Sequence, residues 1–252
     1  MQARTLPAAR GIAWVTGGFL LYRRGPALLS MLTMFYLLVA VGSSLLAPVG
    51  PFLLSLLLPT LTVLVSNGCR ILDRPPGTPL VHTELLQCVT AQRGPLLRLG
   101  GLQLVSTLLV LGVDLLIDAS DWSALVLDEE ALQPLHMLRL TLLAFPMFMA
   151  FWFAPLLTAW DGVPAAKSLF FSLVASLRNW RAFLAYGAVV VAIGVVLPGL
   201  LLFAAAAISA EALTLLSAAM PMLLLLIFAP VLMASVYLSY RDVFVTSVSV
   251  DA

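Results

Sequence analysis

Few residues in this apolar chain could carry ionic chemistry, and Asp114 is the clearest candidate. It lies near the far end of an otherwise uncharged stretch, and Asp118 follows four residues later on the same face of a helix. Arg139 begins the next uncharged stretch, so a helical hairpin would bring it near both carboxylates. Two interpretations stay open: an outer ion pair that ties the hairpin together, or a proton or cation coupling site.

Four arginines are candidates for contacts with phosphate-bearing lipid headgroups, because a guanidinium can bind a phosphate through two hydrogen bonds. They are Arg24, Arg93, Arg178 and Arg181. The last two follow residues 164–177, which are predicted to form an amphipathic surface helix. Its apolar face is expected to contain Leu169, Phe170, Leu173, Val174 and Leu177. This helix either packs against the bundle or takes part in headgroup recognition.

Other familiar chemistry is missing from the sequence. Cys69 and Cys88 are predicted to be reduced thiols on the cytoplasmic side, without a structural disulfide. His82 and His136 are predicted to lie on opposite faces of the membrane, so they cannot share a metal ion. Neither a phosphate-binding glycine loop nor a hydrolase motif is found. We therefore expect no metal, no cofactor, no catalytic residue and no enzymatic activity.

Composition defines the class of protein that must position these residues. The 252 residues are 62% hydrophobic and only 10% charged, with a mean hydropathy of +1.09. Soluble domains carry about 25% charged residues, so a water-soluble globule is excluded. The net charge of +1 gives no attraction to nucleic acid. The sequence predicts an all-α polytopic membrane protein, with residues 1–252 forming a single integral membrane domain.

The spacing of charges predicts six transmembrane helices, arranged as three hairpins with interfacial amphipathic helices. A bilayer core needs about 20 helical residues without an exposed charge, and Glu211 divides the last long uncharged region in two. An interfacial helix within residues 1–25 is expected to place Trp14, Phe19 and Tyr22 at the headgroup level. The predicted spans cover residues 27–46, 52–69, 99–117, 140–160, 182–210 and 212–240.

The distribution of basic residues predicts the orientation. In the six-span topology, twelve of the thirteen lysines and arginines fall on one side of the membrane, and Arg139 is the exception. Cytoplasmic loops retain an excess of Lys and Arg. Both termini are therefore predicted to be cytoplasmic, in a bacterial inner membrane.

The three hairpins share features that suggest an internal repeat. Arg24, Arg93 and Arg178 each end the amphipathic stretch before an odd-numbered span. The even-numbered spans contain paired prolines, and helix kinks are predicted at Pro59, Pro155 and Pro230. The sequence therefore suggests a pseudo-threefold arrangement of hairpins about an axis along the membrane normal. The alternative is a chance alignment of leucine-rich strings.

Short motifs along nearly the whole chain carry a family resemblance. They include Arg10-Gly11, Pro48-Val49-Gly50, Cys69-Arg70, Trp152-Phe153-Ala154-Pro155, Lys167-Ser168-Leu169-Phe170-Phe171-Ser172 and Arg178-Asn179-Trp180-Arg181-Ala182-Phe183. The chain resembles an uncharacterised family of proteobacterial inner-membrane proteins. It also looks distantly like the multi-span membrane domains beside some glycerophosphodiester phosphodiesterases. The resemblance implies an inner-membrane location and no catalytic residue.

Two kinds of function remain open. The first is a structural or accessory protein that binds a membrane protein partner or lipid. The second is a small permease or channel for an apolar or weakly polar solute, built from three hairpin repeats. The bilayer is the expected environment in both cases, and no nucleic acid partner is expected. A polar cavity at mid-depth would favour the permease, whereas a lipid-filled or packed centre would favour the accessory role.

Overall fold

Most of the residues that the computed structural model describes are helical. The described residues are 3–46, 49–75, 83–120 and 129–244, leaving aside the side chains of residues 118–134. Six helical segments are long and apolar enough to cross a membrane. They are Pro26–Ser44, Gly50–Leu72, Arg93–Ile117, Leu135–Trp160, Trp180–Ile208 and Ala210–Phe244. The prediction of an all-α polytopic membrane protein is confirmed.

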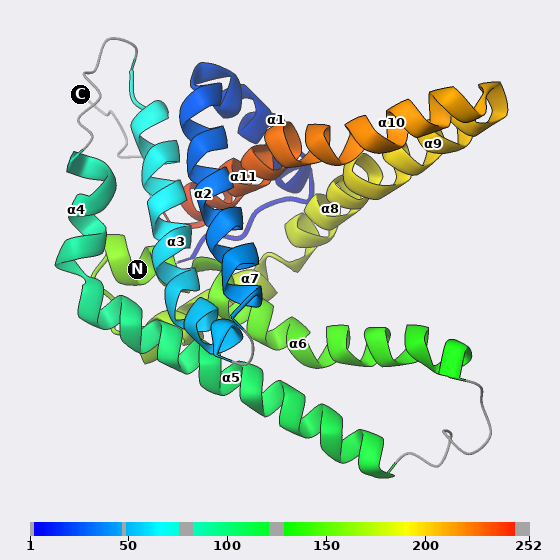
Figure 1. Cartoon of the computed structure of the whole chain (residues 1–252). Coiled ribbons are helices and arrows are strands. Elements are labelled where there is room, and N and C mark those ends of the chain that lie inside the picture. Colours follow the sequence, from blue (N-terminus) through cyan, green and yellow to red (C-terminus); the bar gives the residue numbers. More distant parts are fainter. Residues whose placement is uncertain (1–2, 47–48, 76–82, 121–128, 245–252) are drawn as a thin grey trace.

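These segments form three hairpins that leave a common base in different directions (Figure 1). The first hairpin joins α2 (Pro26–Ser44) to α3 (Gly50–Leu72), and the second joins α5 (Arg93–Ser120) to α6 (Glu129–Trp160). In the third hairpin both arms contain a π-helical turn. The elements of its first arm are α8 (Trp180–Val191), η2 (Ala192–Val196) and α9 (Leu197–Ile208). Those of its second arm are α10 (Ala210–Leu223), η3 (Leu224–Phe228) and α11 (Ala229–Phe244).

Three shorter helices join the hairpins at the base, and their packing closes a ring. They are α1 (Ala9–Arg24), α4 (Thr83–Ala91) and α7 (Ala165–Arg178). α4 precedes the second hairpin and packs on α3 of the first, and α7 precedes the third and packs on α6 of the second. α1 precedes the first hairpin and packs on α8 and α11 of the third. Each short helix therefore connects its own hairpin to another one.

The buried core lies at this base rather than along the length of the hairpins. One cluster joins α1, α2, α3, α8 and α11 around Trp14, Leu29 and Tyr237. A second joins α3, α5, α6, α7 and α11 around Phe153 and Tyr240. By contrast, α9 packs mainly on α10 and η2, and its apolar side chains are largely exposed. The far parts of the hairpins therefore present apolar surface to their surroundings, as lipid-facing helices do.

α1 lies deeper in the protein than the sequence predicted. Gly11 and Gly18 allow this because a Cβ at Gly11 would come within 2.0 Å of the Ala182 carbonyl oxygen. At Gly18 a Cβ would come within 2.7 Å of the Val231 carbonyl oxygen. Small residues permit such close backbone approach between helices. The Trp14 side chain is therefore buried in the core and does not contact lipid headgroups, whereas its predicted depth in the membrane stays a prediction.

α7 packs through a face that the sequence analysis did not select. Its buried residues are Ser168, Ser172, Ala175 and Ser176, while Phe170 and Leu177 are 62% and 53% exposed. The Ser172 hydroxyl accepts from the Phe153 amide at 2.9 Å and donates to the Met149 carbonyl at 2.9 Å. These two backbone groups would pair with each other in an ideal helix. Packing onto α6 thus uses small polar residues, and the aromatic face points outward.

The predicted kink positions Pro59, Pro155 and Pro230 are all buried. Pro230 lies two residues after the end of the π-helical turn η3 and has no N–H for the carbonyl of Leu226, four residues earlier. That carbonyl instead accepts from the Tyr22 hydroxyl at 3.2 Å and the Ser30 hydroxyl at 3.1 Å. Side chains from two other helices therefore satisfy the freed backbone group, as proline in a membrane helix requires.

The boundary between the last two spans falls two residues earlier than predicted. Ser209 has an extended backbone, with φ of −165°, and its hydroxyl accepts from the Ala212 amide at 3.0 Å. It is therefore the N-cap of α10. Glu211 then lies in the first turn of α10, where a carboxylate is favourable at the positive end of the helix dipole.

Candidate functional site

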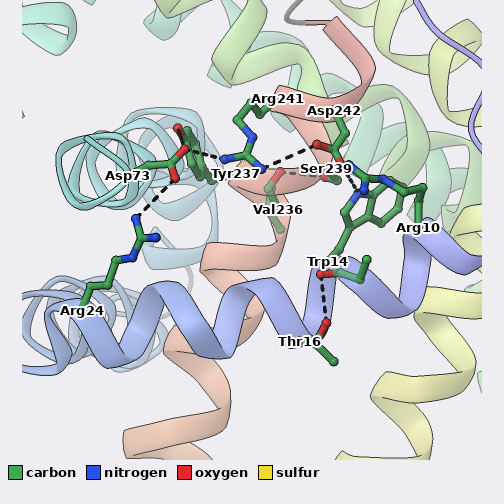
Figure 2. A network of polar contacts seen from close by, with 11 residues as sticks. Arg10, Trp14, Thr16, Arg24, Asp73, Val236, Tyr237, Ser239, Arg241 and Asp242 are labelled. Carbon is green, nitrogen blue, oxygen red and sulfur yellow. Dashed lines mark hydrogen bonds and ion pairs between the residues drawn. The ribbon is translucent and has the colours of Figure 1, made fainter. Parts of the chain in front are cut away.

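A polar pocket of about 210 Å³ lies at the base between α1, α11 and the end of α3. Figure 2 shows the three arginines Arg10, Arg24 and Arg241 around the two carboxylates Asp73 and Asp242. α1 supplies its wall through residues on one helical stripe. These are Arg10, Ala13, Trp14, Gly17, Leu21 and Arg24, with Leu20 at the edge.

Asp73 is held from two sides. The Arg241 guanidinium lies 2.6 Å from its Oδ2, and the Tyr237 hydroxyl donates to the same oxygen at 2.9 Å. Arg24 approaches the other oxygen at 3.9 Å and also donates to the Leu72 carbonyl at 3.5 Å. These contacts tie the end of the second span to the last helix. Because Arg24 is 59% exposed and makes only long contacts, it is the most loosely held of the three arginines.

Asp242 is the more buried carboxylate, with 10% of its side chain exposed. Its Oδ2 accepts from the Arg10 guanidinium at 2.6 Å and from the Trp14 indole N–H at 3.0 Å. Arg241 lies 3.8 Å from its other oxygen. A buried charge is stable only when it is paired and hydrogen-bonded, and these three contacts meet that condition.

The pocket carries a net positive charge. Three guanidinium groups face two carboxylates, and each guanidinium has five N–H donors. Only a minority of these donors contact an acceptor among the described residues. The arrangement can therefore accept an additional anionic group with several oxygen atoms, such as a phosphate.

A second, apolar pocket of about 520 Å³ lies directly beside the polar one. It is lined by α1, η2, α9, α10, η3 and α11, and Leu20 lines both pockets. Thr16 is the polar residue of its wall, and its hydroxyl bonds to backbone carbonyls of its own helix. Both π-helical turns contribute side chains, among them Ile193 and Phe228. π-helical turns are frequent at functional sites.

A third pocket, of about 510 Å³, lies between α3 and α4 and is lined mainly by polar residues. Arg74 and Glu84 form an ion pair there, and the hydrogen bond that Arg74 donates to Glu84 raises the pKa of Arg74. Asn67 donates to the Leu85 carbonyl at 2.8 Å and accepts from the Trp160 indole at 2.9 Å. These contacts hold α3, α4 and α6 together, so we assign this pocket a structural role.

The predicted contact between Asp114 and Arg139 is present in the structure. Arg139 Nε donates to Asp114 Oδ1 at 2.7 Å, and only 8% of the Asp114 side chain is exposed. His136 completes the group, with its Nδ1 2.9 Å from Arg139 and its Nε2 3.7 Å from Asp114. The side chain of Asp118 lies outside the described residues. Whether the pair is structural or couples to an ion stays a prediction.

The four arginines predicted for headgroup contacts do not form one site. Of these four arginines, Arg24 lines the polar pocket. The other two arginines of the pocket, Arg10 and Arg241, were not predicted from the sequence. Arg178 lies 3.5 Å from the Thr5 hydroxyl, and Arg181 stacks on the Trp180 ring at 5.4 Å. Arg93 is exposed at the start of α5. Their predicted contacts with lipid remain predictions.

The sequence analysis missed Asp73 and Asp242, yet a signal for them exists. Each even-numbered span has an aspartate at its basic end: Asp73, Asp161 and Asp242. Asp161 accepts from the Tyr240 hydroxyl, so all three connect different helices at the base. Asn179 is a further missed residue, because its buried amide bonds the backbone of Arg4 and Leu6 at 2.8 Å each.

No group of three His, Cys, Asp or Glu residues that could hold a metal ion occurs within the described part of the chain. Cys69 is buried in α3 and Cys88 is partly buried in α4. His82 lies outside the described residues, so its predicted position relative to His136 is not addressed. The structure thus offers the polar and apolar pockets of α1 as its candidate site.

The six apolar helices and their polar base define a polytopic membrane protein. The chain is 35% identical, over 204 residues, to a probable inner membrane protein of Burkholderia thailandensis, and the match covers 74% of each chain. It belongs to the same family as that protein, which confirms the first resemblance seen in the sequence. No family model and no solved structure matches the chain. The resemblance to membrane domains beside glycerophosphodiester phosphodiesterases stays a prediction.

Proposed function

We propose that the protein is a structural or accessory protein of the inner membrane, without enzymatic activity, which holds bilayer lipid between its hairpins. The observation that carries this proposal is the apolar pocket of about 520 Å³ between α1 and the arms of the third hairpin. Its volume lies within the range of about 300–1,000 Å³ typical of small-molecule sites. Its walls offer almost no polar group to a hydrophilic solute.

The exposure of the hairpins supports a lipid occupant. Large apolar side chains such as Phe203, Leu215 and Met222 are exposed on α9 and α10. Within a membrane, contact with acyl chains is as favourable for such side chains as contact with another helix. Lipid can therefore fill the space between the arms without a loss of hydrophobic stabilisation.

The alternative of a small permease has one observation in its favour. The three short helices connect the hairpins in a ring, as expected of three related units around an axis. The polar pocket beside α1 and the pocket between α3 and α4, however, lie at the base and are accounted for by contacts between helices. This arrangement favours the accessory role over a solute path.

Native mass spectrometry of the protein released from membranes in mild detergent tests the proposal. We expect retained phospholipid, and we expect fewer bound lipids after Leu197→Trp, which fills the apolar pocket with a bulky side chain. Leu200→Trp is the matched control, because Leu200 is exposed on the same helix and does not line the pocket. Loss of all lipid from the unaltered protein, together with solute flux in liposomes, would support the permease instead.

A further inference from the structure

The polar and apolar pockets adjoin at one residue. Leu20 of α1 lines both, with Arg24 one turn further along the helix toward the polar pocket. Thr16 and Phe19 line the apolar pocket, whereas Gly17 and Leu21 line the polar one. A positively charged pocket and an apolar pocket thus lie side by side along α1, and the exposed side chain of Leu20 lies between them.

We propose that these two pockets form one binding site for an anionic phospholipid, with the headgroup phosphate among Arg10, Arg24 and Arg241 and an acyl chain in the apolar pocket. The inference rests on the proposed lipid-binding function and adds the charge of the headgroup and the residues that select it. Its basis is the combination of charge and shape at one place. In a phospholipid the anionic phosphate lies next to the apolar acyl chains, and the two pockets lie next to each other at Leu20 in the same order.

Charge complementarity favours an anionic lipid over a zwitterionic one. The two carboxylates of the pocket are already engaged, Asp73 by Arg241 and Tyr237, and Asp242 by Arg10 and Trp14. The side chains of the three arginines are more exposed than these carboxylates, so a ligand can reach them more easily. The excess of positive charge in the pocket attracts a phosphate but repels the ammonium group of a zwitterionic headgroup.

Arg24 is the residue through which the headgroup can be tested most cleanly. Its nearest carboxylate oxygen is 3.9 Å away and its side chain is 59% exposed, so its removal leaves the buried contacts of the base intact. Arg23 precedes it on the same helix, is exposed, and does not line the pocket. The variants Arg24→Gln and Arg23→Gln therefore change the net charge equally but affect the site differently.

The experiment measures how the full-length protein in detergent distributes between phosphatidylglycerol and phosphatidylethanolamine, using native mass spectrometry. We expect a preference for phosphatidylglycerol that R24Q lowers about tenfold, because only this lipid has a net negative charge for Arg24 to attract. R23Q is expected to leave the preference unchanged. An equal effect of both variants would show general surface attraction and overturn the inference.

A second variant tests whether one ligand occupies both pockets. Leu20→Asn is expected to weaken phosphatidylglycerol binding without altering the binding of soluble glycerol phosphate, because Leu20 is exposed and touches the chain rather than the phosphate. Glycerol phosphate or inorganic phosphate that binds as tightly as the lipid would contradict a phospholipid site. If lipid is retained but R24Q and L20N change nothing, this inference fails while the proposed function stands. If no lipid is retained at all, both fail.

Discussion

At the scale of single residues, the base is held together by polar side chains that reach between helices. Trp14 shows how this works, because its ring packs edge-on against Phe183 at 5.5 Å while its indole N–H bonds to Asp242. The same side chain thus fills space and satisfies a buried carboxylate. Asn179 plays a comparable role for the chain that precedes α1.

We expect Trp14→Phe to lower the free energy of unfolding by about 2 kcal/mol, because Asp242 would lose one hydrogen bond that is made to a charged group. Denaturant unfolding in mixed micelles measures the change. Trp180→Phe is the control and should have little effect, since Trp180 is 53% exposed. Equal losses in both variants would show that the indole hydrogen bond contributes nothing specific.

The outer pair of Asp114 and Arg139 gives a second prediction at this scale. Asp114→Asn should destabilise the protein by about 3 kcal/mol, the typical cost of breaking a shielded ion pair. Glu211→Gln, which changes an exposed carboxylate in α10, should cost little. The double variant Asp114→Arg, Arg139→Asp should recover part of the loss. A stable D114N protein that has lost ion flux would identify a coupling site instead.

Ion pairs could be predicted from the sequence where charged residues are rare, but not where several charged residues lie close together in the sequence. Asp114 and Arg139 could be paired because each stands alone in an uncharged stretch. Asp73 and Asp242 are flanked by arginines in sequence, so nothing local indicates which arginine each one contacts. Arg10 and Asp242 are separated by 232 positions, and only the packing of α1 on α11 brings them together.

At the scale of elements, proline and π-helical turns shape the third hairpin. η2 and η3 lie opposite each other, since a Cβ at Gly194 would come within 2.7 Å of the Phe228 ring. Each turn lies next to a proline, Pro198 after η2 and Pro230 after η3. The sequence predicted a kink at Pro230 but did not single out Pro198, and it did not predict that the helix would change its hydrogen-bonding pattern beside them.

The carbonyl of Leu226 provides a test of this interpretation. We expect Tyr22→Phe and Ser30→Ala to have small effects separately, because either hydroxyl can still bond the carbonyl. The double variant should lower the free energy of unfolding by about 1 kcal/mol. In a Pro230→Ala background the same double variant should cost less, because the backbone regains an N–H donor. If the free-energy changes of the two single variants simply add, with or without Pro230, the two hydroxyls do not substitute for each other at the Leu226 carbonyl.

α7 shows why amphipathic patterns can mislead in a membrane protein. The sequence predicts an apolar stripe that contains Phe170 and Leu177, and in a water-soluble protein such a stripe would pack inward. In a bilayer that stripe can face lipid, and close helix contact is made by small residues such as Ser168 and Ser172. Hydrophobic periodicity therefore located the helix but not the face that packs.

At the scale of the whole molecule, the ring of short helices is the feature that unites the three hairpins. The sequence predicted the number of spans well, because an uncharged stretch of about 20 residues has few alternatives to a transmembrane helix. It could not predict that the core would lie at one end. The internal repeat and the pseudo-threefold axis remain predictions, supported by the way each short helix bridges two hairpins.

The predicted orientation can be tested with topology reporters. The segments carrying most of the basic residues meet at the base, for example where Asn179 bonds the backbone of Arg4. We expect a reporter after the C-terminus to be cytoplasmic and one inserted among residues 121–128 to be periplasmic, because basic segments are retained in the cytoplasm. Signals from the same side would refute the six-span topology.

The central claim is that lipid, rather than a solute path, fills the space beside α1. A structure determined in nanodiscs that contain phosphatidylglycerol tests it most directly. We predict acyl-chain density in the pocket lined by Leu197, Leu223 and Phe228, with headgroup density near Arg24. A water-filled path through the hairpins, or hairpins closed on each other with no lipid between them, would contradict the account.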